Sequence, residues 1–290
     1  MSLPSHNHQQ TYCRVSALEA GILSIPLGRI LQGGQGNVIV PSLSFILQRS
    51  SSKETVIFDL GICEDFQRYP ESVTSRIQRG FQPMSESLSK GSVLPSSVDY
   101  VILSHLHWDH IGDPAPFSNA TFIVGAESAS MNDLGFPTSQ PLAASEMLPK
   151  HRTRLERADT WTPLGPFPRA FDIFGDGSIY IVDAAGHCPG HINLLARTSA
   201  DGGWIFLAGD SAHDRRLITG DGEMATKVGV ECAAPIAHLH RDKSLAEAHI
   251  GRIARLMGEP RVRVLLAHDR EWFEANVGGP SFWPGIIPTL

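Results

Sequence analysis

The sequence predicts an α/β fold that forms one domain over residues 1–290. Short apolar, β-branched runs recur along most of the chain and are separated by turn residues, a pattern typical of strands. One stretch, Ala246–Met257, carries apolar residues at helical spacing, with Asp242 or Ser244 ahead of it as the cap. We find no internal repeat and no long linker, so we expect a single domain.

The expected strands begin near the N-terminus. Residues Tyr12–Val40 predict one or two strands joined by a turn that contains Gly33, Gly34 and Gly36. The apolar runs Leu43–Gln48 and Thr55–Leu60 lie on either side of the polar turn Arg49–Glu54 and predict a hairpin. The strands expected after this first region are Leu43–Gln48, Thr55–Leu60, Asp99–Ser104, Thr121–Val124, Ile179–Ala184, Ile192–Ala196, Trp204–Ala208 and Arg263–Ala267.

Three shorter helices are expected between these strands. They are an amphipathic helix over Ser72–Gly80, a short helix over Glu127–Asp133 and a basic helix fragment over His151–Arg157. Residues 64–98 carry scattered aromatics and many Ser and Gln, which favours a lid or insertion between core elements. The three arginines of the basic fragment are expected on a solvated helix face.

The composition excludes several protein classes. Hydrophobic residues make up 42% of the chain and charged residues 19%, which supplies a core and excludes disorder or a collagen-like repeat. The net charge of −6 and the absence of a basic run argue against nucleic acid as a partner. Four scattered cysteines predict reduced thiols. Without a leader-like or membrane-spanning run, we expect a cytoplasmic protein with no membrane partner.

The segment SHLHWDH places four metal-binding side chains directly after an apolar strand. Residues at i and i+2 of an extended backbone share a face, so His105 and His107 can bind one ion together. Asp109 and His110 follow where the strand turns and can reach a second ion. Imidazole and carboxylate ligands suit zinc or a similar divalent metal.

The segment HLHWDH resembles the HxHxDH signature of the metallo-β-lactamase superfamily. The remaining parts of that pattern occur in order along the chain, and an early strand end, Asp59-Leu60-Gly61, is similar to the family's as well. The resemblance implies a four-layer αββα sandwich of two mixed sheets flanked by helices. The later matching segments are GHCPGH with His187 and His191, LAGD with Asp210, and LAHD with His268.

The resemblance implies two divalent metal ions. Zinc is the expected metal, with manganese, iron or cobalt as alternatives. Asp210 would bridge the two ions, and His191 is expected to support the site as a hydrogen-bonded core histidine. The ligands of one ion would be His105, His107 and His187, and those of the other Asp109, His110 and His268.

Within this superfamily the chain resembles the lactonase-like group, which includes N-acyl homoserine lactonases and fungal lactone and lactam hydrolases. The resemblance implies a hydrolase that opens a cyclic ester or amide of a secondary metabolite or xenobiotic, with hydroxide supplied at the metal pair. Asp109 would orient the hydroxide and move its proton to the leaving group. A thioesterase that releases acyl or polyketide chains from a carrier is the alternative, and a mononuclear-iron persulfide dioxygenase a weaker one.

One position departs from the acyl homoserine lactonases. Three residues after the bridging aspartate they carry a tyrosine that assists at the substrate oxygen, and here that residue is His213. It could serve as a catalytic donor, or be an exposed loop histidine held by Asp214. We expect a small-molecule substrate and leave a homodimer open. Aromatic and apolar side chains expected to line the substrate pocket are Phe66, Tyr69, Phe81, Met84, Trp108 and Phe136.

Overall fold

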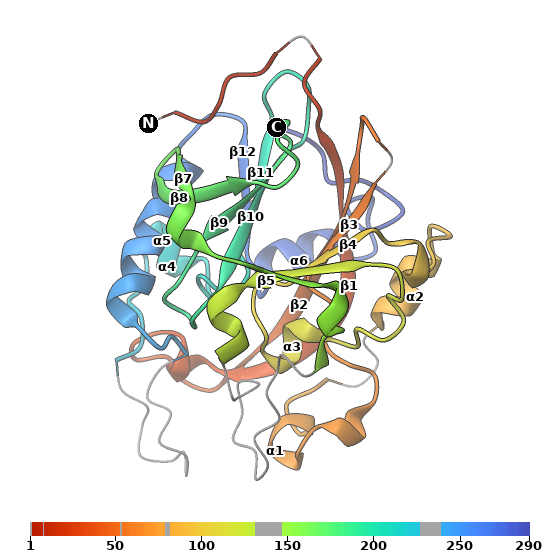
Figure 1. Cartoon of the computed structure of the whole chain (residues 1–290). Helices are drawn as coiled ribbons and strands as arrows, with labels where there is room; N and C mark the ends of the chain where they lie inside the picture. Colours follow the sequence, from red (N-terminus) through yellow and green to blue (C-terminus); the bar gives the residue numbers. More distant parts are fainter. Residues whose placement is uncertain (1, 8, 53, 79–81, 131–146, 227–238) are drawn as a thin grey trace.

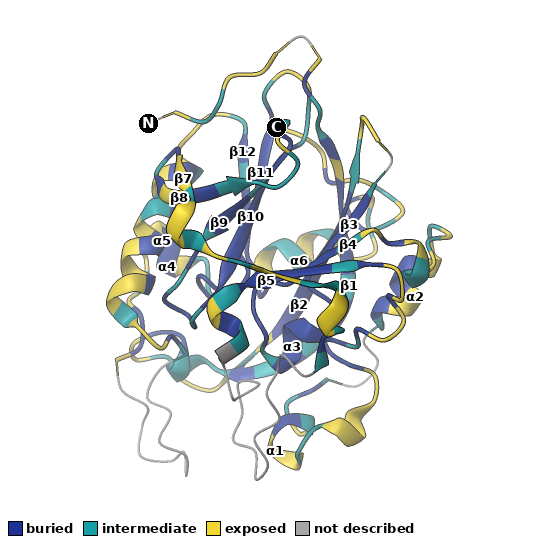
Figure 2. Ribbon diagram, in the orientation of Figure 1, coloured by how far each residue is buried: buried dark blue, intermediate teal, exposed yellow. Residues whose placement is uncertain are grey.

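Two six-stranded β-sheets pack face to face, with helices on their outer sides (Figure 1). The computed structural model describes residues 2–7, 9–52, 54–78, 82–130, 147–226 and 239–290. This architecture is the αββα sandwich expected from the resemblance. The residues buried in the core follow the strands of both sheets, whereas exposed residues gather on the helices and connecting loops (Figure 2).

The first sheet has the strand order β1-β2-β3-β4-β5-β6. Its first two pairings are antiparallel, and β3 to β6 run parallel. The long hairpin β1–β2 confirms two strands joined by the glycine-containing turn, although the second continues through Pro41 rather than restarting at Leu43. Its strands are β1 (Cys13–Pro26), β2 (Asn37–Arg49), β3 (Thr55–Phe58), β4 (Tyr100–Ile102), β5 (Thr121–Gly125) and β6 (Thr153–Glu156).

The second sheet has the order β12-β11-β10-β9-β8-β7, an antiparallel meander to which β12 adds in parallel. Strands β7 and β8 were not expected, because Pro163, Gly165 and Pro168 interrupt their sequence. Its strands are β7 (Thr162–Leu164), β8 (Phe167–Asp172), β9 (Ile179–Asp183), β10 (Ile192–Arg197), β11 (Trp204–Leu207) and β12 (Val262–Leu265).

The core between the sheets comes from alternating residues of facing strands. Phe45 and Leu47 of β2 belong to the same buried cluster as Leu194 of β10 and Leu207 of β11. Ile46, between the first two, points to the opposite side of its sheet and joins the core beneath the helices. β2 is therefore buried on both faces, in agreement with the continuous burial of residues 40–47.

Six α-helices lie in the described parts of the chain. They are α1 (Glu71–Thr74), α2 (Met84–Ser89), α3 (Trp108–Ile111), α4 (Arg216–Thr219), α5 (Lys243–Met257) and α6 (Arg270–Asn276). The same parts hold the 3-10 turns η1 (Leu27–Arg29), η2 (Phe66–Arg68), η3 (Pro95–Ser97), η4 (Ala126–Ser130), η6 (Lys150–Arg152) and η7 (Ala158–Thr160). Among the helices described, none has the length and apolar character needed to span a bilayer.

Two of the helix predictions were wrong. The helix expected over Ser72–Gly80 ends at Thr74, because the following backbone bonds to β1: Ser24 N donates to Arg76 O and Gln78 N donates to Ile22 O. Residues 79 and 80 lie outside the described residues.

The fragment His151–Arg157 forms a 3-10 turn and then strand β6, which pairs with β5. β6 lies at the edge of its sheet, where charged side chains discourage pairing with another strand. Arg152 donates to the carbonyl of Phe117 at 3.0 Å and so is not on a solvated helix face.

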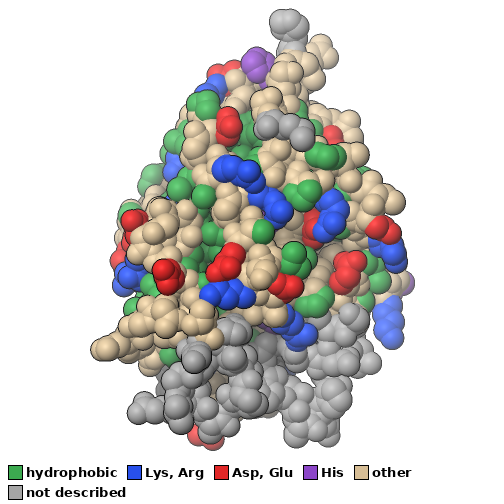
Figure 3. Space-filling view, turned by 90° about the vertical axis from the view of Figure 1, so that its left-hand side faces the viewer, with side chains coloured by type: hydrophobic (Ala, Val, Ile, Leu, Met, Phe, Trp, Pro, Cys, Tyr) green, Lys and Arg blue, Asp and Glu red, His purple; other side chains and the backbone are tan. Residues whose placement is uncertain are grey.

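The short helix expected over Glu127–Asp133 is the 3-10 turn η4 as far as Ser130, and residues 131–133 lie outside the described residues. On the face shown in Figure 3, Lys and Arg side chains alternate with Asp and Glu. Surface ion pairs such as Arg157–Asp159, at 3.0 Å, fit this mixed pattern and contribute little to stability.

The cap of α5 offers a direct test of the helix assignment. The side chain of Asp242 accepts a hydrogen bond from Leu245 N at 2.9 Å, as expected for an N-cap. Replacing Asp242 with Ala should lower the free energy of unfolding by about 1 kcal/mol. Chemical denaturation would measure this change. Asp242→Ser, which restores an accepting oxygen, should recover most of the loss, and equal stability of both variants would contradict the cap.

Candidate metal centre

The seven predicted ligands all lie at the ends of strands and in the turns that follow, at one edge of the sandwich. His105, His107, Asp109 and His110 follow β4 of the first sheet, the last two within α3. His187, Asp210 and His268 come from the second sheet, after β9, β11 and β12. Gly209, beside Asp210, has φ +48°, and a side chain there would meet His191 Nε2 at 2.8 Å. A glycine is therefore required where these turns meet.

Three imidazoles form the first cluster. His105 Nε2 lies 2.8 Å from His107 Nδ1, and His187 Nε2 lies 3.0 Å from the same nitrogen. Asp210 Oδ2 faces this cluster, 3.7 Å from His105 Nε2 and 3.5 Å from His187 Nε2. Four potential ligand atoms thus meet at one point, and three of the four residues are buried.

The second cluster lies on the other side of the same carboxylate. Asp210 Oδ1 is 3.1 Å from His110 Nε2 and 3.2 Å from His268 Nε2. Asp109 Oδ2 lies 3.7 Å from His268 Nε2. The two oxygens of Asp210 therefore face different sets of nitrogens, the arrangement required of a carboxylate that bridges two ions.

The outer nitrogens of three of these histidines are held by acceptors. Asp59 accepts hydrogen bonds from Ser104 N at 2.6 Å and from His110 Nδ1 at 2.8 Å. Ser104 Oγ donates to Asp59 at 2.8 Å and lies 2.9 Å from His105 Nδ1. His268 Nδ1 donates to the carbonyl of Pro41 at 2.7 Å.

These contacts fix the tautomer of each ring. With the proton on Nδ1, the Nε2 lone pair points inward, which is the arrangement that supports metal-binding histidines. The donor set of buried imidazoles and carboxylates fits a divalent ion such as zinc. The residues present therefore fit the implied metal pair.

Two further histidines complete the polar shell. His191 is fully buried; its Nδ1 donates to Ala184 O at 3.1 Å, and its Nε2 accepts from Asp210 N at 3.2 Å. It thus supports the loop that carries Asp210. His213 is buried, and its Nε2 lies 3.1 Å from Asp210 Oδ2, while Asp214 pairs with Arg216. The alternative of an exposed loop histidine held by Asp214 was wrong.

The two carboxylate-facing histidines of the second cluster favour protonation in the metal-free protein. Burial opposes a charge on His110, but Asp210 and Asp59 outweigh it and raise its pKa well above the usual range. Burial also opposes a charge on His268, but Asp210 outweighs burial and raises the pKa of this histidine. Burial lowers the pKa of His105 and His187 well below the usual range. The two clusters therefore differ: burial favours neutral His105 and His187 in the first, and Asp210 favours protonated His110 and His268 in the second.

A family model described as the metallo-beta-lactamase superfamily matches residues 38–268, which contain every residue of both clusters. The chain belongs to the metallo-beta-lactamase superfamily.

Relatives of similar sequence carry several different names. "Gamma-lactamase FDB1" of Fusarium pseudograminearum is 32% identical over 59% of this chain and 45% of its own length. A Penicillium brevicompactum protein named "Cytochrome P450 monooxygenase mpaDE'" is 30% identical over 86% of this chain and 32% of its own length. The chain therefore spans less than half the length of these two relatives. Others are named metallo-hydrolase and N-acyl homoserine lactonase.

The fold is shared with solved lactonase structures. A structure of an N-acyl homoserine lactone hydrolase, with the product N-hexanoyl-L-homoserine bound at its catalytic metal center, superposes with a TM-score of 0.69. The match covers 99% of this chain and 100% of that one at 16% identity. At this identity the likeness shows the common metallo-β-lactamase fold alone.

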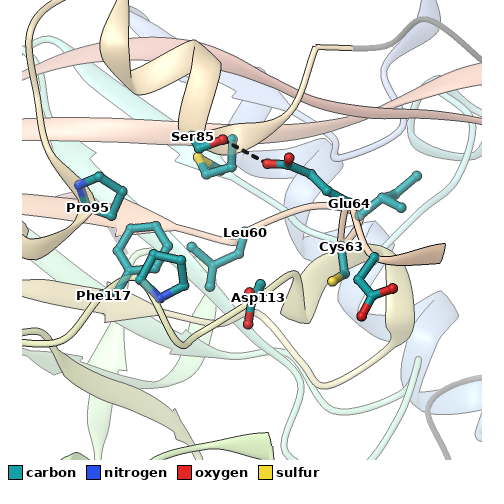
Figure 4. Close-up of a pocket in the computed structure, with 11 residues that line it drawn as sticks. Leu60, Cys63, Glu64, Ser85, Pro95, Asp113 and Phe117 are labelled. Atoms are coloured by element: carbon teal, nitrogen blue, oxygen red, sulfur yellow. Dashed lines mark hydrogen bonds between the residues drawn. The ribbon is translucent and has the colours of Figure 1, made fainter. Parts of the chain in front are cut away.

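Four of the six predicted substrate-pocket residues belong to the described part of the chain, and they lie in different surroundings. Tyr69 and Trp108 pack edge to face with ring centroids 5.6 Å apart, and Trp108 is buried in the core. Phe66 is partly exposed in η2, and Phe81 and Phe136 lie outside the described residues. Met84 lines a cavity of about 340 Å³ together with Leu60, Cys63, Glu64, Asp113 and Phe117 (Figure 4).

This cavity is separate from the metal-binding side chains: none of the predicted ligands lines it in the described structure. It lies beside the segment 64–98, between β3 and β4, where Glu64 accepts a hydrogen bond from Ser85 at 2.7 Å (Figure 4). Its lining combines apolar side chains such as Leu60 and Phe117 with the carboxylates of Glu64, Asp65 and Asp113.

Sequence reasoning missed three features that lie beside the predicted ligands. His240, before α5, lies with its ring centroid 5.2 Å from that of His187 and 5.1 Å from that of His213. The carboxylate of Asp59 orients His110, and the carbonyl of Pro41 orients His268. Two of these features left a signal in the sequence: Asp59 lies at a strand end, and His240 forms an HxH pair with His238. The carbonyl of Pro41 left none.

The raised pKa values of His110 and His268 lead to a pH prediction. Metal ligation requires neutral imidazole, so zinc binding to the metal-free protein at pH 7 should release protons from His110 and His268. Protonation stabilises the metal-free fold below the unfolded histidine pKa, and that contribution is lost as the pH rises through the raised values. The release of protons on zinc binding should decrease as the pH rises through the raised pKa values of His110 and His268. Zinc affinity should fall as the pH is lowered.

Titration calorimetry in two buffers with different enthalpies of ionisation measures this release. At pH 7 the observed binding enthalpy should change with the buffer. An enthalpy that is independent of the buffer would show that both rings are already neutral.

Proposed function

We propose that this chain is a dinuclear-metal hydrolase that opens a lactone or lactam ring. The observation that carries the proposal is the placement of Asp210, whose two carboxylate oxygens face two separate groups of histidine nitrogens. Two complete donor sets on either side of one carboxylate favour a pair of ions. They also disfavour the mononuclear-iron alternative, which would leave Asp109 and His268 without a metal.

In this proposal each cluster holds one ion. His105, His107 and His187 hold the first, and Asp109, His110 and His268 hold the second, with Asp210 between them. Two divalent ions bound there would supply a water made acidic enough to act as a nucleophile at neutral pH and a positive centre for the carbonyl oxygen.

The side chains around the pair then orient the substrate and move protons. Asp109 lies at the edge of the second cluster and is 6% exposed, so it can accept the proton of the attacking water. It then delivers that proton to the ring oxygen or nitrogen that leaves. His213, whose Nε2–H lies against Asp210 Oδ2, is the second donor and can turn toward the developing negative charge on the carbonyl oxygen.

The relatives and the proton donors support this substrate class. Ring opening leaves the new carboxylate and the new hydroxyl or amine in one product molecule. The carboxylate of Asp109 and the nearby imidazole of His213 can supply the proton transfers that this reaction needs. The relatives named gamma-lactamase and N-acyl homoserine lactonase favour small cyclic amides and esters as substrates.

The test combines elemental analysis with hydrolysis assays. Protein purified without chelator is analysed for metal, and a panel of lactones, lactams and thioesters is assayed. About two equivalents of zinc, with ring opening faster than thioester cleavage, would support the proposal. Preferred cleavage of acyl thioesters would favour the thioesterase alternative. One equivalent of iron without hydrolysis would overturn the dinuclear assignment.

A further inference from the structure

A third group of histidines lies beside the proposed pair. The ring centroids of His187, His213 and His240 are separated by 5.1 to 5.2 Å, so the three imidazoles surround a common point. All three are at most 4% exposed, and one ligand nitrogen from each lies within 4.8 Å of the others. The proposed function uses only His187 of the three as a metal ligand.

The backbone holds this group together. Arg241 N donates to His187 O, and Asp242 N donates to Gly186 O, both at 2.9 Å. These two bonds fasten the segment before α5 to the turn that carries His187. His240 is therefore placed beside His187 by fixed backbone contacts.

The hydrogen bonding of His213 leaves one nitrogen directed away from Asp210. Its Nε2 lies 3.1 Å from Asp210 Oδ2, whereas its Nδ1 is buried without a hydrogen-bond partner among the described residues. A histidine that donates one N–H to a carboxylate and keeps the other nitrogen as a lone pair has the usual form of a metal ligand. Two nitrogens on one zinc lie about 3.3 Å apart, given bonds of about 2.0–2.1 Å, so small ring rotations bring this group into range.

We propose that His213 and His240, with His187 as the neighbouring wall, form an auxiliary position for a third divalent metal ion. Water molecules complete the coordination of this third ion, because His187 is already a ligand of the metal pair. Repulsion by the two nearby ions makes this position weaker than the pair. An ion there pins His213 against Asp210 and prevents it from donating to substrate, so excess metal slows turnover. The inference rests on the proposed dinuclear function.

Equilibrium dialysis of the zinc-loaded protein against rising free zinc, followed by elemental analysis, tests this position. The wild type should bind two equivalents tightly and a third at least about a hundredfold more weakly, in line with the like charges. The variant His240→Gln should keep the two tight equivalents and lose the third. His6→Gln/His8→Gln, which removes two histidines of the polar N-terminal segment, is the matched control and should retain it.

Turnover of the best substrate in the panel, measured over the same zinc range, provides a second readout. Inhibition should follow the third equivalent in the wild type and in the control, and should need at least about tenfold more zinc in His240→Gln. Saturation of the wild type at two equivalents, or a third equivalent that persists in His240→Gln, would overturn the proposal. Fewer than two tight equivalents would instead count against the dinuclear function. His240→Phe, compared by circular dichroism, separates loss of the donor from misfolding.

Discussion

Replacing Asp210 with Ala should abolish binding of both ions and lower kcat/KM by about a thousandfold or more, because one side chain faces both clusters. The carboxylate lies within 3.2 Å of His110 and His268 on one side and within 3.7 Å of His105 on the other. Elemental analysis of the purified variant measures the metal, and the lactone and lactam panel measures turnover.

The matched control for this substitution is Asp214→Ala. Asp214 lies four residues further along the same loop, but its carboxylate pairs with Arg216 and belongs to neither cluster. Asp214→Ala should retain about two equivalents of metal. If Asp210→Ala also kept two equivalents and full turnover, the bridging role would be ruled out.

Replacing Asp59 with Ala should have the second-largest effect, although Asp59 is not a predicted ligand. Its buried carboxylate accepts hydrogen bonds from Ser104 N, Ser104 Oγ and His110 Nδ1. Without it, His110 loses the group that fixes its tautomer, and metal affinity should fall about 10- to 100-fold. The free energy of unfolding should also fall by about 2–3 kcal/mol, because buried donors lose their acceptor.

Competition with a chromogenic chelator measures the affinity, and denaturation of the metal-free protein measures the stability. Asp59→Asn is the informative comparison, because Asp59 has φ +62° and asparagine tolerates this backbone conformation. Its amide oxygen still accepts from one donor, so it should retain more affinity than Asp59→Ala. Equal affinities in the two variants and the wild type would show that His110 needs no support from Asp59.

The predicted ligands could be found from the sequence because each follows a strand whose apolar run is visible. His105 follows β4, Asp210 follows β11 and His268 follows β12. A histidine or aspartate directly after a recognisable strand therefore indicated a ligand and its position at the sheet edge. The structure brings all seven together, and their role as ligands stays a prediction until metal is measured. His240 escaped notice because no expected strand precedes it, although His238 and His240 have the same HxH spacing as His105 and His107.

The errors in the fold have a similar physical origin. The stretch Thr153–Glu156, within the expected basic helix fragment His151–Arg157, has no alternating apolar pattern because it is an edge strand, and its structure depends on pairing with β5. α1 ends early because Arg76 and Gln78 bond to β1, a contact that lies about fifty residues away in sequence. In both places tertiary hydrogen bonds outweigh the local helix preference of the segment. A local sequence pattern carries no information about such hydrogen bonds.

The contribution of both sheets to the metal centre has a consequence for folding. His105 and His268 are far apart in the chain and belong to different sheets, so neither sheet alone can assemble the centre. The unfolded chain offers no preformed site, and metal binding then draws the equilibrium toward the state in which both sheets are docked. Ions bound at the proposed centre would therefore stabilise the docked arrangement of the two sheets, and chelation should weaken this docking before it disturbs the pairing of strands within either sheet.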